Sequence, residues 1–354
     1  MPGIKGQAAT PTPEICIIGS LNIDFVTSTP RCPGPGETLT ATSLTVTAGG
    51  KGGNQAVACG RASFIAKETQ DVAVGMIGAV GADDVYYSTL LKPALEASGA
   101  NTANIEESSE AQTGSASIIV EEDNGENRIL VVPGANHAGM MSDVAQIVSA
   151  VKNQGNPGVI VMQGEIPRKT TLGLLEYFNG GVCDRAHVVF NPAPVYPEGI
   201  SLAAVKGTSV LIMNETEAVQ MSRSIAGLPV SSSQPDKLDT LQTAELAPRF
   251  HEMAKVQIVL ITLGSKGVYF STRTGRSGNV RGVKVAKVLD TTAAGDTFVG
   301  YFSTDLARFL AKGATLEEFD AEIEAAVQKA NAAAAKCVQQ RGAAQSIPFA
   351  YDME

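Results

Sequence analysis

The stretch Ile15-Cys16-Ile17-Ile18-Gly19 is a short apolar run that stops at a glycine. Such a run is typical of a strand buried in the middle of a sheet. Similar runs recur at 72–77, 159–162, 187–190, 210–213 and 257–262. Helical patterns lie at 86–98, 143–151 and 170–178, and again at 296–311 and 316–338. Strands that alternate with helices predict an α/β fold, a doubly wound and mostly parallel sheet flanked by helices.

Two segments depart from this alternation. Residues 37–48 alternate threonine with apolar residues, and the alternation shifts near Ser43. This pattern predicts a half-exposed strand pair or a bulged strand. Residues 115–132 hold two apolar runs around Asp123-Asn124-Gly125, a strong hairpin signal. A small sheet buries little surface by itself. We therefore expect it to act as a lid over a ligand cleft or to contact another subunit.

The remaining composition is that of one large domain. We expect a flexible tail at 1–13, a single domain at 14–354 and a polar insertion at 222–243.

The net charge of -9 argues against nucleic-acid binding. The 5 cysteines contain no CxxC pair, and the 3 histidines are not spaced as metal ligands. No membrane span or signal peptide is apparent, so we expect the cytoplasm, with the nucleus as an alternative.

The string Asp290-Thr291-Thr292-Ala293-Ala294-Gly295-Asp296 leads into a predicted helix. Its small residues would leave the N–H groups of the helix N-terminus exposed, and such groups bind anions. A carboxylate beside an anion is repelled by it, so Asp296 suggests a general base. The alternative interpretation of Asp296 is an ordinary helix N-cap.

A second string, Gly49-Gly50-Lys51-Gly52-Gly53-Asn54-Gln55-Ala56, also precedes a helix. Its glycines indicate a close backbone approach to a ligand, or else a surface turn. It is not a Walker A loop, because Gly52 follows the lysine where that loop has Ser or Thr.

Polar residues follow several of the predicted strands. Asn22 and Asp24 come after the first strand, where ligands bind in open α/β sheets. Asn214 and Glu217 could face a hydrated Mg²⁺ or could simply begin a helix. Glu165 and the segment 262–267 stand in the same position after their own strands. Each of these could also be an ordinary turn.

Two other classes of protein share some of these features. A nicotinamide dehydrogenase is disfavoured, because no GxGxxG string opens the first strand–helix unit. A sugar-binding protein without catalytic activity would have no reason to keep Asp296 beside an anion site.

Taken together, these strings resemble the ribokinase/PfkB family of carbohydrate kinases from about 14 to 348. The resemblance is strongest to the members that phosphorylate ribose, because Asn22-Ile23-Asp24, Asn191-Pro192-Ala193-Pro194 and Asn214-Glu215-Thr216-Glu217 are also present. It implies ATP-dependent phosphorylation of D-ribose at O5, with Mg²⁺. The alternative is another acceptor of the same family, such as deoxyribose, fructose or adenosine.

The resemblance also implies a role for each motif. Asp296 would be the base, and Ala293, Ala294 and Gly295 would form the anion hole. The implied sugar contacts are Asn22, Ile23, Asp24, Gly50, Lys51, Gly52, Gly53, Asn54, Glu165 and Asp296. The implied nucleotide contacts are Asn214, Glu217, Thr262, Leu263, Gly264, Ser265, Lys266, Gly267, Gly295, Asp296 and Asn331. Glu217 would be the acid linked to Mg²⁺ and phosphate.

Two further expectations come only from the resemblance. A monovalent cation, normally K⁺, would activate the enzyme beside the anion hole. Its implied ligands are Asp290, Thr292, Cys337, Gln340, Gly342 and Ser346, most of them through backbone carbonyls. The small sheet would cover the sugar and pair with the same sheet of a second subunit, which predicts a homodimer.

Overall fold

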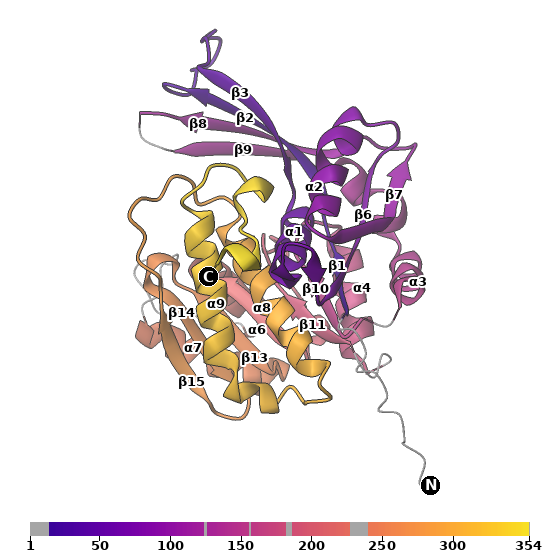
Figure 1. Cartoon of the computed structure of the whole chain (residues 1–354), viewed down its shortest axis with the longest axis vertical. Helices are drawn as coiled ribbons and strands as arrows, with labels where there is room; N and C mark the ends of the chain where they lie inside the picture. The colour runs from indigo at the N-terminus through magenta and orange to yellow at the C-terminus, as the bar shows by residue number, and fades with distance from the viewer. Residues whose placement is uncertain (1–13, 124–125, 156, 182–185, 227–239, 354) are drawn as a thin grey trace.

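The computed structural model describes residues 14–123, 126–155, 157–181, 186–226 and 240–353. Its centre is a sheet of nine strands in the order β15-β14-β13-β12-β11-β10-β1-β6-β7 (Figure 1). The strands from β13 to β7 pair in parallel, and β14 and β15 join antiparallel at one edge. The bounds are β1 (Glu14–Ile18), β6 (Ala73–Gly81), β7 (Ala100–Ser108), β10 (Val159–Met162), β11 (His187–Phe190), β12 (Val210–Asn214), β13 (Ile258–Thr262), β14 (Gly267–Thr272) and β15 (Ser277–Arg281). The predicted doubly wound, mostly parallel sheet is confirmed.

Helices cover both faces of the sheet. One face carries α1 (Lys51–Ser63), α2 (Lys92–Ala97), α8 (Ala294–Leu310) and α9 (Ile323–Cys337). The other carries α3 (Val144–Gln154), α4 (Arg168–Asn179), α5 (Leu202–Val205), α6 (Glu215–Ala226) and α7 (Thr240–Ala254). In β1, Ile15 and Ile17 pack on the first layer, and Cys16 and Ile18 on the second. This two-sided burial explains why β1 reads as a continuous apolar run.

Short helical segments connect these elements. One π-helical segment, Tyr87–Leu91, leads into α2. The 3-10 segments are Gly134–His137, Gly139–Ser142, Gly264–Lys266, Glu318–Ala321, Ala344–Ser346 and Ala350–Asp352.

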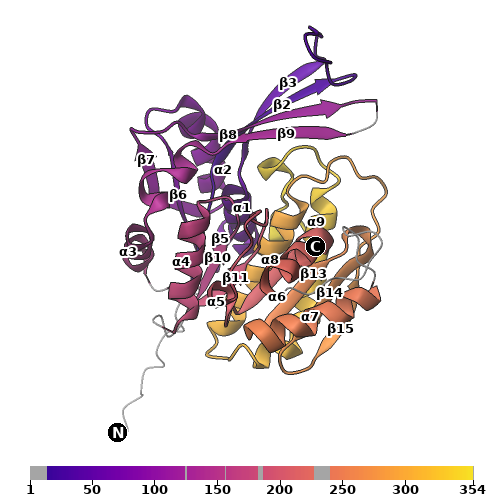
Figure 2. The ribbon, with the colours of Figure 1, turned by 180° about the vertical axis from the view of Figure 1, so that it is seen from behind.

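A second sheet projects over one end of the main sheet, and we call it the lid sheet (Figures 1 and 2). Its strands are β3 (Ser43–Gly49), β2 (Asn22–Thr29), β8 (Gly114–Glu121) and β9 (Asn127–Val132), in that order. β2 pairs antiparallel with β3 and parallel with β8, and β8 pairs antiparallel with β9. A separate two-stranded sheet, β4 (Phe64–Ala66) with β5 (Thr69–Gln70), follows α1.

The structure corrects some sequence predictions. The alternative interpretation of Asn22 and Asp24 as an ordinary turn is wrong, because residues 22–29 form strand β2 and the lid strands on both sides supply its partners. Residues 37–42 are not a strand; they are exposed apart from Leu39, which is half-buried, and β3 begins only at Ser43. The segment 316–338 is not one helix, since a 3-10 segment precedes α9.

Two predictions fall largely on residues outside the description. The tail at 1–13 lies outside the described residues, and so do 227–239 of the predicted insertion at 222–243. The two ends of that insertion belong to α6 and α7.

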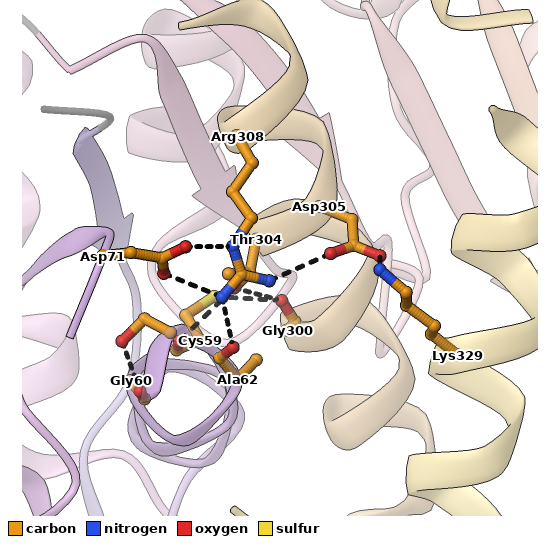
Figure 3. A network of polar contacts seen from close by, with 10 residues as sticks. Cys59, Gly60, Ala62, Asp71, Gly300, Thr304, Asp305, Arg308 and Lys329 are labelled. Carbon is orange, nitrogen blue, oxygen red and sulfur yellow. Dashed lines mark hydrogen bonds and ion pairs between the residues drawn. The ribbon is translucent and has the colours of Figure 1, made fainter. Parts of the chain in front are cut away.

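Helices α1 and α8 lie against each other and are joined at their C-terminal parts. A side chain at Gly300 would place its Cβ 2.3 Å from the Cβ of Ala58, so the glycine permits the close approach. Arg308 donates from Nε and Nη2 to the two carboxylate oxygens of Asp71, both at 2.8 Å (Figure 3). Its Nη2 also donates to the Ala62 carbonyl at 2.8 Å. These contacts hold the two helices in one orientation, and their N-termini both point to the site described next.

Candidate active site

The polar side chains that follow the parallel strands gather at one edge of the main sheet, beneath the lid sheet. Parallel strands all end at the same edge, so segments far apart in the chain meet there. The N-termini of α1 and α8 complete the arrangement (Figure 1).

Glycines allow the N-terminus of α1 to touch the end of β1. Gly50 has φ of 82°, in the left-handed region that favours glycine. A Cβ at Gly52 would lie 2.6 Å from the backbone carbon of Gly19 and from the nitrogen of Ser20. The glycine-rich string is therefore needed for backbone packing, and the surface-turn interpretation does not fit.

Asp296 is buried in the first turn of α8 and is held by two amide groups from α1. Asn54 donates to one carboxylate oxygen at 3.0 Å, and Gln55 donates to the other at 2.9 Å. The N-cap position belongs to Ala293, which has φ of 60° and makes no side-chain cap. Asp296 is therefore not an N-cap, and the simple helix-cap interpretation is wrong.

The residues predicted to form an anion hole, Ala293, Ala294 and Gly295, lie beside this carboxylate. The first N–H groups of a helix have no partner within the helix. Nothing lies within 4 Å of a Cβ built on Gly295, so this turn of α8 faces open space. The N-terminus of α8 can therefore receive a negatively charged group.

One lysine stands among several carboxylates. Burial would lower the pKa of Lys51, but the nearby charges of Asp296, Glu165 and Glu217 raise it above its ordinary value. Burial raises the pKa of Asp24 to about 7, and the charges of Glu165 and Asp296 add to the rise. The site is therefore a compact acidic centre around one cation.

Glu165 and Asn22 are oriented by neighbours. Glu165 accepts hydrogen bonds from the Ser20 hydroxyl at 2.5 Å and from the Lys51 backbone N–H at 2.8 Å. The Asn22 amide oxygen accepts from Asn136 Nδ2 at 2.8 Å. The Asn136 amide is itself anchored on the backbone of Leu21. Asn136 is buried and was not singled out from the sequence, because a lone asparagine in a short 3-10 segment carries no pattern.

A cavity of about 580 Å³ opens next to the N-terminus of α8. Seven of the predicted nucleotide contacts line it: Asn214, Thr262, Gly264, Ser265, Gly267, Gly295 and Asn331. Apolar side chains line it as well: Val283, Val285, Val288, Phe298 and Val338, with Ala334. A cavity with an apolar wall and a polar end next to an anion site fits a nucleotide base and its phosphates.

The apolar wall was missed by the sequence analysis. Val283, Val285 and Val288 lie in a segment without regular structure, where alternating valines were not recognised as a lining. Val283 and Val288 are 48% and 52% exposed, so about half of each side chain is free to contact a ligand.

Some predicted contacts lie elsewhere. Leu263 is buried in the core, and the Lys266 side chain is mostly exposed, 4.0 Å from Glu215. Ile23 lines a different cavity together with Phe25, because neighbouring residues of β2 face opposite sides of the lid sheet. Asn22 and Asp24 share the other side.

Asn214 and Glu217 contact each other at the start of α6. The backbone N–H of Asn214 donates to Glu217 at 2.8 Å, and the N–H of Glu217 donates back to Asn214 Oδ1 at 2.8 Å. This reciprocal pair is a capping box. Burial raises the pKa of Glu217, which the Asn214 hydrogen bond and Lys51 oppose, and the charge of Asp296 adds to the rise. Glu217 therefore both begins a helix and faces the acidic centre.

Most of the predicted cation ligands form one connected group. One oxygen of Asp290 accepts from the N–H and hydroxyl of Thr292 at 2.9 and 2.6 Å, and the other accepts from the Gly342 N–H at 2.9 Å. The Cys337 sulfur lies 3.0 Å from the Ser346 hydroxyl and 3.6 Å from the Thr292 carbonyl oxygen. Gln340 is exposed, and its side chain is not joined to this group by any described contact. Within the described ranges, no three His, Cys, Asp or Glu side chains are grouped as metal ligands.

The fold and this site together define an α/β protein with a nucleotide-sized cavity beside a buried carboxylate. A family profile described as "pfkB family carbohydrate kinase" matches residues 12–350. The chain belongs to the pfkB family of carbohydrate kinases.

Relatives and solved structures agree with this family. The chain is 35% identical to the ribokinase of Schizosaccharomyces pombe over 344 residues, which is 96% of each chain. It resembles the solved ribokinase of Giardia lamblia with a TM-score of 0.80 and 29% identity, over 97% of each chain. It also resembles the Arabidopsis thaliana ribokinase solved with ribose and ATP, with a TM-score of 0.73 and 27% identity, over 97% of each chain. No helix of the described part is long and apolar enough to cross a membrane.

Proposed function

We propose that the chain transfers the γ-phosphoryl group of ATP to the 5-hydroxyl of D-ribose. The observation that carries this proposal is the buried Asp296 carboxylate, which two amide donors hold at the N-terminus of α8 beside the nucleotide-sized cavity. The relative from S. pombe and the Arabidopsis structure with ribose and ATP support ribose as the acceptor.

In this proposal ribose binds between the lid sheet and the edge of the main sheet. Asn22, Asp24 and Glu165 offer amide and carboxylate groups to its hydroxyls, and Lys51 and Asn54 lie beside them. A lid over the sugar would exclude water, which would otherwise accept the phosphoryl group.

The reaction then moves one proton and one phosphoryl group. Asp296 takes the proton of the ribose 5-hydroxyl as the oxygen attacks the γ-phosphorus, and the bond from that phosphorus to the β-phosphate oxygen breaks to release ADP. The N–H groups of the turn Ala293-Ala294-Gly295 would stabilise the negative charge that develops on the transferred group.

Mg²⁺ fits the acidic residue next to the nucleotide cavity. Glu217 faces the acidic centre, and Asn214 lines the cavity beside it. Hard cations such as Mg²⁺ take oxygen ligands and keep several waters. Glu217 would hold the ion through water, and the bound ion would neutralise charge on the phosphates.

A monovalent cation fits the group around Asp290. The Asp290 carboxylate joins the loop before α8 to the loop after α9. The ion would be held by oxygen atoms of Thr292, Gly342 and Ser346, together with the backbone oxygens of Cys337 and Gln340. The Cys337 thiol is engaged with Ser346 and is not needed as a ligand. A bound K⁺ would stiffen the turn that holds the anion site.

We also propose a homodimer through the lid sheet. Strand β9 is the edge of that sheet and is exposed along its whole length. Four consecutive apolar residues, Ile129 to Val132, are between 53% and 73% exposed. An apolar edge strand of this kind pairs readily with another strand. A second copy of the chain is its natural partner, since it carries the same edge.

The cytoplasm remains the proposed location. The described cysteines, Cys16, Cys32, Cys59 and Cys337, are all free thiols. Free thiols suit a reducing compartment. Cys183 lies outside the described residues.

The test of the function is ADP release by the purified protein with Mg-ATP and ribose, deoxyribose, fructose or adenosine, each in K⁺ and in Na⁺. We expect turnover with ribose that is faster in K⁺. Turnover with another acceptor would keep the kinase mechanism and replace the sugar, and equal rates in K⁺ and Na⁺ would remove the cation proposal. A folded protein without turnover on any acceptor would contradict the proposed function.

A further inference from the structure

We infer that Gln55, held in one orientation by Asn191, is a positioning residue that aims the Asp296 carboxylate. This inference rests on the proposed function, in which Asp296 is the base. Gln55 lies in α1, and its side chain reaches Asp296 in α8, Asn191 after β11 and Gln163 after β10. The residue is completely buried, so none of these contacts competes with water.

The direction of the hydrogen bonds is set at one end by a backbone carbonyl. The Ile212 carbonyl in β12 can only accept, and Asn191 Nδ2 lies 2.9 Å from it. The Asn191 amide must therefore turn its oxygen to the other side. That oxygen lies 3.1 Å from Gln55 Nε2, so Gln55 must present its NH₂ group there.

The oxygen of the Gln55 amide has a buried partner as well. Gln163 Nε2 donates to Gln55 Oε1 at 2.7 Å, and Gln163 is only 1% exposed. A rotated Gln55 amide would turn its oxygen toward the oxygens of Asn191 and Asp296. Such a rotation replaces two hydrogen bonds by two contacts between oxygen atoms, so a single orientation is stable.

The locked amide has a defined consequence for Asp296. One N–H of Gln55 is used by Asn191, and the other donates to Asp296 Oδ1 at 2.9 Å. Asn54 donates to Oδ2 at 3.0 Å. Each carboxylate oxygen thus accepts one N–H hydrogen bond from α1. The carboxylate plane is fixed by two donors, and the lone pairs that remain must receive the substrate proton.

This arrangement separates positioning from binding. Gln55 and Gln163 are deep beneath the site, and neither is among the residues that line the nucleotide cavity. Loss of the Gln55 donor should therefore affect the chemical step far more than the affinity for either substrate. A residue that merely filled space would not act through Asp296.

The test uses the rate of a single turnover of ribose and ATP, together with steady-state KM values and thermal unfolding. For Gln55→Met we expect the single-turnover rate to fall by about tenfold or more, while both KM values change by less than about twofold. Gln163→Met touches Gln55 but not Asp296, and it should cause a smaller loss in the same direction. It also carries the test if Gln55→Met fails to fold.

A double-mutant cycle makes the mechanism explicit. In an Asp296→Asn background, Gln55→Met should cause no further loss, because the group it aims is already gone. The control is Gln154→Met, the same change at a partly buried glutamine on α3 that is outside the site. It should retain the wild-type rate to within about twofold.

The outcomes distinguish this inference from the function on which it rests. A full rate in folded Gln55→Met, a rise of KM without loss of rate, or an additive loss in the Asp296→Asn background would each overturn the positioning role alone. A wild-type protein that turns over no acceptor would overturn both.

Discussion

The amide nitrogen of Asn54 lies 3.0 Å from a carboxylate oxygen of Asp296, although 242 residues separate them in the chain. The contact joins the first turns of α1 and α8. These are the helices at which the glycine-rich string 49–56 and the string 290–296 lie. The base proposed for the reaction and the glycine-rich string therefore form one unit.

The first prediction concerns Asp296. Asp296→Asn should lower kcat by at least about a hundredfold, because an amide cannot accept the substrate proton. Ribose affinity, measured by calorimetry, should change little. The matched control is Asp305→Asn in the same helix, where the carboxylate pairs with Arg308 and Lys329 and is remote from the site. Near-normal turnover in Asp296→Asn would remove the proposed base.

The second prediction concerns Asp24 and pH. Burial, with the charges of Glu165 and Asp296, raises the pKa of Asp24 from 3.8 to about 7 in the folded protein. The folded state then holds a proton that the unfolded state releases, so this contribution to stability is lost as the pH rises toward and through about 7.

The Asp24→Asn side chain cannot titrate, so this variant should not lose stability at this site as the pH rises. Without ribose, its free energy of unfolding relative to wild type should rise by roughly 2 to 3 kcal/mol between pH 5 and pH 8. Urea unfolding at both pH values measures it. A difference between variant and wild type that stays constant with pH would show that Asp24 is ionised throughout.

The third prediction concerns the nucleotide cavity. Ala334 lines its apolar wall from α9, so Ala334→Phe should occupy the space of the base. We expect the KM for ATP to rise at least about tenfold while ribose affinity is kept. Ala325→Phe, at an exposed position of the same helix, is the control and should leave the KM unchanged. An unchanged KM in Ala334→Phe would place the nucleotide elsewhere.

The fourth prediction concerns the link between α1 and α8. Arg308→Met would leave the Asp71 carboxylate and the Ala62 carbonyl without this donor (Figure 3). Because the groups are partly buried, we expect a loss of about 1 to 3 kcal/mol in the free energy of unfolding. Arg273→Met, which breaks an exposed ion pair with Glu317, should cost less than about 1 kcal/mol. Equal losses in the two variants would mean that the Arg308 contacts stabilise the fold no more than an exposed ion pair does.

The fifth prediction concerns the dimer. Leu130 on β9 is 73% exposed, and Leu130→Asp should place a charge on the proposed contact between two lid sheets. By light scattering at micromolar concentration we expect a wild-type dimer and a Leu130→Asp monomer. Leu202→Asp, an exposed leucine on α5, should remain dimeric. A monomeric wild type would contradict the lid-sheet interface.

Much of the fold could be read from local patterns. Apart from end residues that are not buried, β1, β10, β11 and β12 are buried on both faces, and such strands are apolar at every buried position. β2 was not predicted, because Asn22 and Asp24 follow β1 closely and polar residues in that place also fit a turn. These residues face the site, and only pairing with β3 and β8 makes the segment a strand.

The site divides in the same way. Asp296 and the glycines around Lys51 are recognisable in the sequence because a helix N-terminus near a ligand demands small residues and a backbone free of clashes. Gln55, Asn136 and the valines of 283–288 carry no such local demand. Their roles depend on partners more than a hundred residues away, or on a wall built from several elements.

The sequence by itself thus determined the alternation of strands and helices, the glycine-rich string at the start of α1, the string that leads into α8 and the identity of the central carboxylate. Each of these depends on chemistry within a few neighbouring residues. Only the tertiary structure decided which oxygen of Asp296 meets which amide, which side of β2 faces the acidic centre and which valines line the cavity beside α8. Those outcomes depend on how distant segments pack, and packing is a property of the whole chain.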